Sequence, residues 1–240
     1  MKSVQSNNFS RLTNDELKVI TGLQKEMHQR FRSVPKEGLY VDYCGERFIV
    51  LPHVFWPFED SKPLFENMVI HPNDTVFDIG TGSGVLAILS AKKRATKIIA
   101  VDINPAAIEN TKINVLNHKL EGIVEVYLSN LFEAIKLTES FDVIMANLPF
   151  RNHLCKKTDL VEASTWDEDL RTNKSFFCDV RKYLKPNGRI YLSQANFGAV
   201  DEILAYATSQ GFTYRLIGSH RMSKDPRVFY AFELSCKGKP

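Results

Sequence analysis

The sequence has few of the features that mark secreted, membrane-embedded or metal-binding proteins. It holds four cysteines in 240 residues, none of them in a C-x-x-C pair, so neither a disulfide framework nor a cysteine-rich zinc site is expected. The amino-terminal residues lack the apolar core of a secretory signal. No apolar run reaches the roughly 18 residues of a transmembrane helix. These absences predict a cytoplasmic protein with no membrane segment and no metal.

The charge is also nearly balanced. Lys and Arg number 31 and Asp and Glu number 28, for a formal net charge of +3. This mild surplus permits a nucleic-acid partner, although dedicated nucleic-acid-binding proteins usually carry a denser basic stripe. Hydrophobic residues make up 44% and charged residues 25%, which is typical of a globular domain and excludes a disordered chain or a coiled coil.

The chain divides into residues 1–70 and an alternating strand-and-helix domain over residues 71–240. In the first part, Thr13 offers a cap for a helix whose apolar residues recur at helical spacing as far as Phe31. A β-hairpin, an aromatic loop and a short helix follow. Their predicted ranges are 39–44 and 47–51 for the hairpin strands, 53–61 for the loop and 62–68 for the helix.

The second part predicts an α/β fold. Strands buried on both faces and joined by helical crossovers indicate a doubly wound, Rossmann-like, mostly parallel sheet of seven strands with one antiparallel member. The strands are predicted at residues 74–79, 97–101, 123–127, 141–146, 189–193, 212–217 and 228–234. The helices are predicted at residues 84–92, 105–117, 166–184 and 200–210, and the third ends at a turn over residues 185–188.

A glycine-rich turn follows the first strand of this domain. In the segment Val76-Phe-Asp-Ile-Gly-Thr-Gly-Ser-Gly84, Gly80, Gly82 and Gly84 allow a tight turn in which a ligand can touch the backbone. The G-x-G-x-G spacing differs from the G-x-G-x-x-G of dinucleotide sites. Asp78, just before the turn, would repel a pyrophosphate but could hold a cationic amino group.

A second carboxylate ends the next strand. Asp102, in the segment Ala100-Val-Asp-Ile-Asn-Pro105, comes about twenty residues after the glycines, where it can accept hydrogen bonds from both hydroxyls of a ribose. A ligand with a ribose, a cationic amino-acid tail and no pyrophosphate fits S-adenosylmethionine. The competing interpretations are a Rossmann domain that binds NAD and a glycine turn without a ligand.

Together the two motifs resemble those of the class I S-adenosylmethionine-dependent methyltransferases, over roughly residues 70–235. The resemblance implies S-adenosylmethionine as the cofactor. The expected cofactor-binding residues are Asp78, Gly80, Thr81, Gly82, Gly84, Asp102, Ile103, Asn130, Leu131 and Asn147.

A third motif, Asn147-Leu148-Pro149-Phe150, ends the fourth strand of the domain and supplies the expected catalytic residues. It resembles the (D/N)-P-P-(Y/F) signature of amino-group methyltransferases. Methyl transfer to a planar nitrogen depends on positioning and on exclusion of water. The Asn147 side-chain oxygen and the Leu148 carbonyl can accept the two N–H groups of the acceptor, Pro149 fixes the backbone, and Phe150 can stack on a flat group. A turn without catalytic function is the alternative.

Flanking residues narrow the resemblance to the glutamine N5-methyltransferases that modify release factors. The loop Val54-Phe-Trp-Pro-Phe-Glu-Asp-Ser61 is similar to the V-Y-x-P-x-E-D-[ST] of their eukaryotic relatives, and Ser129-Asn-Leu-Phe132 is similar to the family's G-D-L-F. Asn130 replaces the acidic residue that would contact the adenine amino group. Its amide oxygen can accept the same hydrogen bond.

Three departures leave the methyl acceptor open. Leu148 replaces the first proline of the signature, and the resulting Asn-Leu-Pro-Phe also resembles the motif of adenine-N6 dimethyltransferases of ribosomal RNA. About one helix precedes the hairpin, where the glutamine methyltransferases have a helical domain. The acceptor wall, residues 151–170, does not match that family, although it offers His153, Trp166, Asp167 and Glu168 as acceptor contacts.

The sequence therefore predicts an S-adenosylmethionine-dependent N-methyltransferase. A protein glutamine or related amide is the favoured acceptor. The alternatives are a small planar metabolite, a base of rRNA or tRNA, and a cofactor-binding module without catalysis.

Overall fold

The computed structural model describes residues 9–156 and 158–236. The helices are α1 (Asn14–Arg32), α2 (Lys62–Asn67), α3 (Val85–Lys92), α4 (Pro105–Asn117), α5 (Leu160–Ala163), α6 (Arg171–Asp179) and α7 (Val200–Ser209), with 3₁₀ turns at Glu168–Leu170 and Val180–Tyr183. The strands are β1 (Leu39–Tyr43), β2 (Glu46–Val50), β3 (Thr75–Ile79), β4 (Lys97–Asp102), β5 (Val124–Leu128), β6 (Phe141–Ala146), β7 (Leu184–Ala195), β8 (Phe212–Arg221) and β9 (Val228–Cys236).

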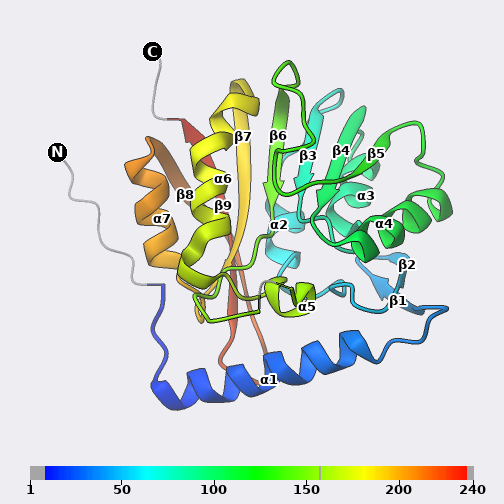
Figure 1. Ribbon diagram of the computed structural model, residues 1–240. Helices are drawn as coiled ribbons and strands as arrows, with labels where there is room; N and C mark the ends of the chain where they lie inside the picture. Colours follow the sequence, from blue (N-terminus) through cyan, green and yellow to red (C-terminus); the bar gives the residue numbers. More distant parts are fainter. Residues whose placement is uncertain (1–8, 157, 237–240) are drawn as a thin grey trace.

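A seven-stranded sheet forms the centre of the molecule (Figure 1). Its strand order is β5-β4-β3-β6-β7-β9-β8, and β9 runs antiparallel to both of its neighbours while the other pairs are parallel. Strands β1 and β2 form a separate antiparallel hairpin. The predicted α/β architecture, with seven strands and one antiparallel member, is confirmed.

Both faces of the central strands β3, β4 and β6 are buried, which explains the nearly continuous apolar runs in these strands. In β4, Ile98 and Ala100 belong to the core cluster that contains α3. Ile99 and Val101 belong to the cluster on the other face, which contains residues of α6 and α7. Figure 1 shows α6 and α7 in front of the sheet and α3 behind it.

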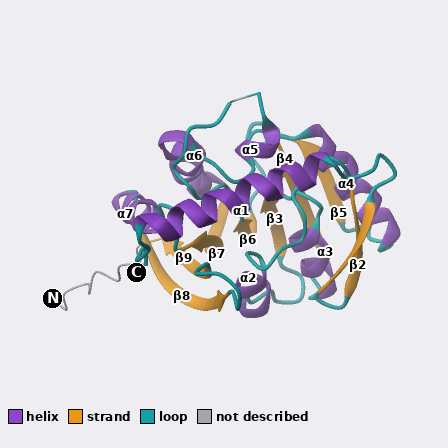
Figure 2. Ribbon diagram, turned by 90° about the horizontal axis from the view of Figure 1, so that it is seen from below, coloured by secondary structure: helices purple, strands orange, loops and turns teal. Residues whose placement is uncertain are grey.

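Helix α1 lies across the carboxyl ends of the parallel strands (Figure 2). It begins at a capping box, in which the Thr13 hydroxyl accepts from the Glu16 backbone N–H and the Glu16 carboxylate accepts from the Thr13 N–H. Two of its four buried side chains are apolar, Ile20 and Phe31.

The other two buried side chains of α1 are polar, and both bind the acceptor wall. The Gln24 side-chain oxygen accepts from Arg151 Nη1 at 2.5 Å and from Trp166 Nε1 at 3.2 Å. His28 Nε2 lies 2.7 Å from the Thr165 hydroxyl oxygen. The helix is thus attached to residues 151–166 through hydrogen bonds as well as through apolar packing.

The helix predicted at residues 166–184 is wrong in part. Asp169 and Leu170 have φ of 56° and 55°, a left-handed conformation that interrupts a helix. The Asp167 carboxylate then accepts from the backbone N–H of Thr172 and of Asn173 in the first turn of α6. Local competition of this kind between an Asp side chain and the helical backbone ends one segment and starts another.

The turn predicted at residues 185–188 lies instead inside β7. Phe141 pairs with Leu184 and Val143 pairs with Arg189, so the register shifts between them. Asn187, at φ 67°, is in the left-handed region. The segment is therefore an irregularity within a long strand, where extra residues are accommodated without breaking the sheet.

The structure predicts that α1 docking depends on pH through His28. Burial lowers the pKa of His28 from its usual 6.5 to about 4. The imidazole of His28 is therefore protonated more readily in the unfolded chain than in the folded protein. As a result, the contribution of His28 to stability is complete above about pH 6.5 and is lost as the pH falls toward 4. Lowering the pH from 7 to 5 should lower the melting temperature of the wild type more than that of His28→Gln, by about 2–4 °C for each kcal/mol of stability lost.

Thermal melts of both proteins at each pH provide the measurement. His71→Gln is the matched control, because His71 is exposed, and this variant should retain the pH dependence of the wild type. Equal pH dependence in the wild type and in His28→Gln would contradict the prediction.

Candidate active site

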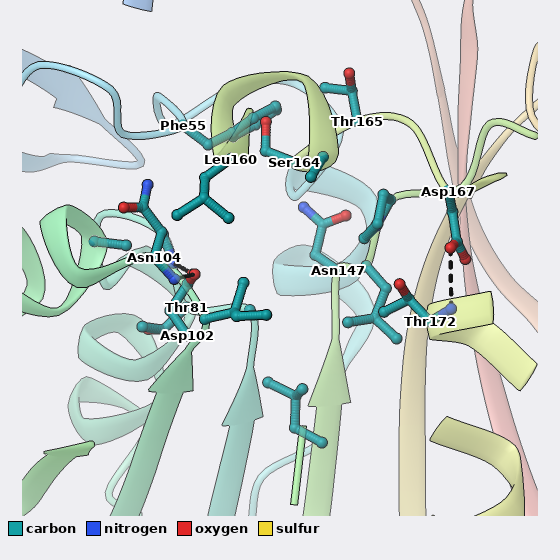
Figure 3. A pocket seen from close by; sticks show the side chains of 18 of the residues that line it. Phe55, Thr81, Asp102, Asn104, Asn147, Leu160, Ser164, Thr165, Asp167 and Thr172 are labelled. Carbon is teal, nitrogen blue, oxygen red and sulfur yellow. Dashed lines mark hydrogen bonds between the residues drawn. The ribbon is translucent and has the colours of Figure 1, made fainter. Parts of the chain in front are cut away.

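A cavity of about 460 Å³ opens at the carboxyl ends of β3, β4, β5 and β6. In Figure 3, Thr81, Asp102 and Asn147 lie above the strand ends, and Phe55 and Leu160 lie across the cavity from them. Ligands of open α/β sheets bind at this edge. The expected site residues that line the cavity are Gly80, Thr81, Gly82, Asp102, Ile103, Asn130, Leu131, Asn147, Leu148, Pro149 and Phe150.

The glycine turn joins β3 to α3 in left-handed backbone conformations. Gly80, Gly82 and Gly84 have φ of 75°, 57° and 85°, a region that side chains other than hydrogen disfavour. Gly84 is not part of the cavity lining. It is the residue before α3, and a Cβ there would lie 2.9 Å from Thr111 Cγ2, so its role is to allow close packing of the turn on α4.

Asp102 faces the cavity from the end of β4. Its Oδ2 accepts from the Gly82 backbone N–H at 2.9 Å, and its Oδ1 accepts from the Asn104 N–H at 2.9 Å. These contacts fix the carboxylate while leaving lone pairs for a ligand. Burial raises the pKa of Asp102 above its usual range, and the backbone N–H groups of Asn104 and Gly82 oppose that rise.

Asp78 lies behind the cavity wall rather than in it. It is 1% exposed, and its Oδ2 accepts from the Thr81 hydroxyl at 2.7 Å. Its Oδ1 has no partner among the described residues. Burial raises the pKa of Asp78 to about 7, so this carboxyl group would gain from a nearby cation. A cationic amino group could reach it through Thr81 or a water molecule.

The loop after β5 supplies a further wall. The Asn130 Nδ2 donates to Glu133 Oε1 at 2.8 Å, which directs the Asn130 side-chain oxygen away from that partner and leaves it able to accept a hydrogen bond. Leu131, at φ 50°, and Ile103, 53% exposed, line the same part of the cavity. An apolar side chain exposed beside a cavity is available to pack on a flat ligand.

Asn147 follows β6 on the other side of the cavity. Its Nδ2 donates to Asp60 Oδ2 at 2.8 Å and to the Ser61 hydroxyl oxygen at 3.1 Å. Among the described residues no donor reaches the Asn147 side-chain oxygen or the Leu148 carbonyl oxygen. The Pro149 carbonyl accepts from Asn173 Nδ2 at 2.6 Å. Asn147 and Leu148 therefore offer two free oxygens.

Phe150 contributes less surface to the cavity than the sequence interpretation assigned to it. The residue is 7% exposed, and its ring packs edge-to-face on Phe197 at 5.5 Å between centroids. A Cβ on Gly198 would lie 2.6 Å from the Phe150 carbonyl oxygen, so the backbone is close-packed here as well. Most of the Phe150 ring therefore serves the core.

The structure adds residues that the sequence analysis did not assign to the site. Asp60 and Ser61 belong to the E-D-S segment of the aromatic loop. The resemblance of this loop to the glutamine methyltransferases was the only feature of the sequence that pointed to these two residues. Trp56 lines the cavity, and its indole N–H is buried without a partner in the described parts of the chain. From α5, Leu160 and Ala163 line the side opposite the strand ends.

The proposed acceptor contacts separate into two kinds. Trp166 is 5% exposed and lies between the rings of His28 and His153, at centroid distances of 4.9 and 4.4 Å. Asp167 is 4% exposed and caps α6. Trp166, Asp167 and Glu168 line the cavity, whereas His153 does not. Trp166 and Asp167 thus shape the wall mainly through contacts within the protein.

The described part of the chain contains no group of three or more His, Cys, Asp or Glu side chains placed to hold a metal ion. Within the same residues no helix has the length and apolar character to cross a membrane.

Comparisons with known proteins identify the family of the chain. The family model for ribosomal protein L11 methyltransferase (PrmA) matches residues 64–159. A protein of Methanocaldococcus jannaschii named "Putative protein N5-glutamine methyltransferase" is 31% identical over 182 residues, which cover 72% of this chain and 88% of the relative. The chain belongs to the class I S-adenosylmethionine-dependent methyltransferases.

Other relatives of this methyltransferase match over shorter parts of their own length. A ribosomal protein L11 methyltransferase of Alkaliphilus oremlandii is 47% identical over 79 residues, 33% of this chain and 25% of the relative. A bifunctional methyltransferase of Rickettsia typhi is 25% identical over 215 residues, 75% of this chain and 41% of the relative. The chain therefore spans less than half the length of these two proteins.

Solved structures share the fold. A tRNA methyltransferase of M. jannaschii superposes with a TM-score of 0.59 at 20% identity, over 85% of this chain and 56% of the other. A 16S rRNA N2 methyltransferase of T. thermophilus, in complex with AdoMet and guanosine, gives a TM-score of 0.60 at 18% identity, over 84% and 50%. At these identities the likeness establishes the fold alone.

The packing of the glycine turn generates a stability prediction. Gly84→Ala should lower the free energy of unfolding by about 1–2 kcal/mol from the left-handed backbone alone, with an added cost from the 2.9 Å approach to Thr111. Urea unfolding measures the loss. Gly122→Ala is the control, because a Cβ there meets nothing within 4 Å; equal stabilities of the two variants would contradict the prediction.

Proposed function

We propose that this methyltransferase transfers a methyl group from S-adenosylmethionine to a planar amide nitrogen, with a glutamine side chain of a protein as the acceptor. The observation that carries the proposal is the pair of free oxygens on Asn147 and Leu148, which share one cavity with Asp102 and the glycine turn. A primary amide has two N–H donors on a single nitrogen, and the two oxygens match them.

The cofactor residues fit the chemistry of S-adenosylmethionine at three points. Asp102 is a half-buried carboxylate that lines the cavity and can accept hydrogen bonds from two ribose hydroxyls. The glycine turn lines the cavity through Gly80 and Gly82, and the Phe55 carbonyl oxygen would lie 3.7 Å from a Cβ on Gly82. Asp78, with an unpartnered oxygen behind Thr81, suits an ammonium group. When bound, the cofactor supplies an electrophilic methyl group on a sulfonium.

The chain itself contributes positioning and exclusion of water. The Asn147 and Leu148 oxygens would orient the acceptor N–H groups so that the nitrogen lone pair, otherwise delocalised into the carbonyl, points at the methyl carbon. The Asn147 and Leu148 oxygens would hold both N–H groups while the nitrogen is methylated, and one of these protons would then pass to solvent. Leu160, Ala163 and Leu148 surround this part of the cavity with apolar surface, which limits competing water.

A protein acceptor suits the charge around the acceptor wall better than RNA does. Arg32 pairs with Asp159 at 2.6 Å, and Arg171 pairs with Asp169 at 3.1 Å and Glu168 at 3.4 Å. These cations are already neutralised, whereas binding to a phosphate backbone depends on free Lys and Arg side chains. The relative named as an N5-glutamine methyltransferase supports the same choice.

The role of Asp102 is tested by cofactor binding. Asp102→Ala removes a charged acceptor from the ribose hydroxyls, a loss of about 1.5–3 kcal/mol, so the dissociation constant of S-adenosylmethionine should rise roughly 10- to 150-fold. Isothermal titration calorimetry measures it, with thermal melts to show that the variant is folded. Unchanged affinity would rule out this role.

The acceptor is tested with radiolabelled S-adenosylmethionine and a cell lysate divided into protein, RNA and small-molecule fractions. Label in protein, recovered as N5-methylglutamine after enzymatic digestion, is the expected result. Label in RNA or only in small molecules would overturn the amide proposal in favour of a base or a metabolite.

Asn147→Ala links that label to the proposed site. Because its effect falls on the acceptor and not on the cofactor, turnover should fall by about 10²–10³-fold with little change in cofactor affinity. Asn117→Ala, an exposed change at the end of α4, is the control and should keep full turnover. A fall in cofactor affinity with turnover intact would assign Asn147 to the cofactor alone.

A further inference from the structure

The orientation of the Asn147 amide is set from outside the strand that carries it. Its partner Asp60 lies 87 positions earlier in the sequence, in the aromatic loop, and is 2% exposed. We propose that Asp60 is a positioning residue that holds the Asn147 amide with its oxygen toward the acceptor, and that this carboxylate thereby selects acceptors that donate N–H. The consequence for turnover rests on the proposed function, whereas the orientation itself does not.

Asp60 is fixed on two sides. Its Oδ1 accepts from the Ser61 backbone N–H at 2.9 Å, and its backbone carbonyl accepts from the Ser193 hydroxyl of β7 at 2.9 Å. Its Oδ2 is thereby directed at Asn147 Nδ2, 2.8 Å away. The loop therefore presents one carboxylate oxygen to Asn147 in a defined position.

Hydrogen-bond chemistry then leaves one arrangement for the Asn147 amide. An ionised carboxylate accepts hydrogen bonds and donates none, so the group facing Asp60 must be Nδ2 and the group facing the cavity must be the oxygen. The Ser61 hydroxyl, 3.1 Å from Nδ2, can either donate or accept and cannot make this choice alone. Asp60 is the partner that decides.

The state of the Asp60 carboxyl agrees with this role. Burial raises its pKa to about 6, and the hydrogen bonds from Asn147 and Ser61 oppose that rise. At neutral pH the group is therefore mainly ionised. No ion pair among the described residues includes Asp60, so hydrogen bonds alone compensate its buried charge, which is a costly arrangement for a merely structural contact.

The isosteric change Asp60→Asn separates orientation from structure. The Ser61 N–H still requires an oxygen on its side, so the NH₂ of the introduced amide faces Asn147. Two NH₂ groups cannot bond to each other, and the Asn147 amide must turn over, with its oxygen inward and its NH₂ toward the cavity. Shape and size at both positions are conserved.

The exchanged pair Asp60→Asn with Asn147→Asp restores a hydrogen-bond-accepting oxygen that faces the cavity. The amide at position 60 donates to one oxygen of the carboxylate at position 147, and the other oxygen of that carboxylate faces the cavity. The double variant has the same net charge and the same number of carboxylates as the wild type, with the carboxylate moved from the buried position 60 to the half-buried position 147. A purely structural role for Asp60 provides no reason for such a rescue.

The first measurement needs no acceptor. The side-chain NH₂ of Asn147 is assigned in ¹⁵N spectra of the full-length protein by its loss in Asn147→Asp. In the wild type its exchange with solvent should be slow, because Nδ2 is bonded to buried Asp60. In Asp60→Asn it should exchange at least about tenfold faster. An Asn147 signal with unchanged exchange would overturn the proposal.

The second measurement is turnover with the acceptor fraction that takes up label. Asp60→Asn should lower kcat by about 10²-fold, with cofactor affinity within about threefold, and the exchanged pair should recover at least about tenfold of that loss. No recovery beyond the single variant would overturn the proposal. Asp142→Asn, which removes an ionised carboxylate at the opposite end of β6, should leave kcat and the Asn147 signal unchanged.

Failure of the proposed function gives a different result. If no amide acceptor is labelled while Asp60→Asn still accelerates exchange of the Asn147 NH₂, the acceptor assignment fails and the orienting role of Asp60 holds.

Discussion

The burial of both sheet faces determines where this protein can place polar chemistry. Strands β3, β4 and β6 are covered by helices on each side, so a polar side chain within them loses water and must find a partner. Asp78 illustrates the cost, since burial raises its pKa to about 7. Because the strands are parallel, their carboxyl ends meet at one edge, and Asp102 and Asn147 come together there although 45 residues separate them in the sequence.

Helix α1, which lies across the carboxyl ends of the strands, is joined to residues 151–166 by polar contacts. Gln24 and His28 of α1 form hydrogen bonds with residues 151–166. Arg151, the first residue of that segment, follows Asn147 by four positions in the chain. The hydrogen bonds of Gln24 with Trp166 and of His28 with Thr165 contribute about 1 kcal/mol each, and the bond from the charged Arg151 guanidinium to Gln24 contributes about 1.5–3 kcal/mol. This side of the cavity is therefore held to α1 by hydrogen bonds as well as by the packing of Ile20 and Phe31.

Local signals explain what the sequence could predict. The glycine turn, Asp102 and Asn147 each lie within a few residues of a strand end, so periodicity and motif spacing placed all three. The break at Asp169 and Leu170 was missed because it depends on Asp167, whose side chain competes with the helical backbone. The extra residues within β7 were missed because apolar patterning cannot distinguish a bulge from a turn.

Contacts distant in the sequence were beyond such signals. Nothing local to Asn147 indicates which end of its amide faces the cavity, because the two ends have the same size and shape. That choice belongs to Asp60, whose own position depends on the hydroxyl of Ser193 from a third segment. The Pro149 carbonyl is likewise held by Asn173 of α6, which binds Asp167. The Asn147 amide and the Pro149 carbonyl are thus held by separate elements, the aromatic loop and α6, rather than by the motif itself.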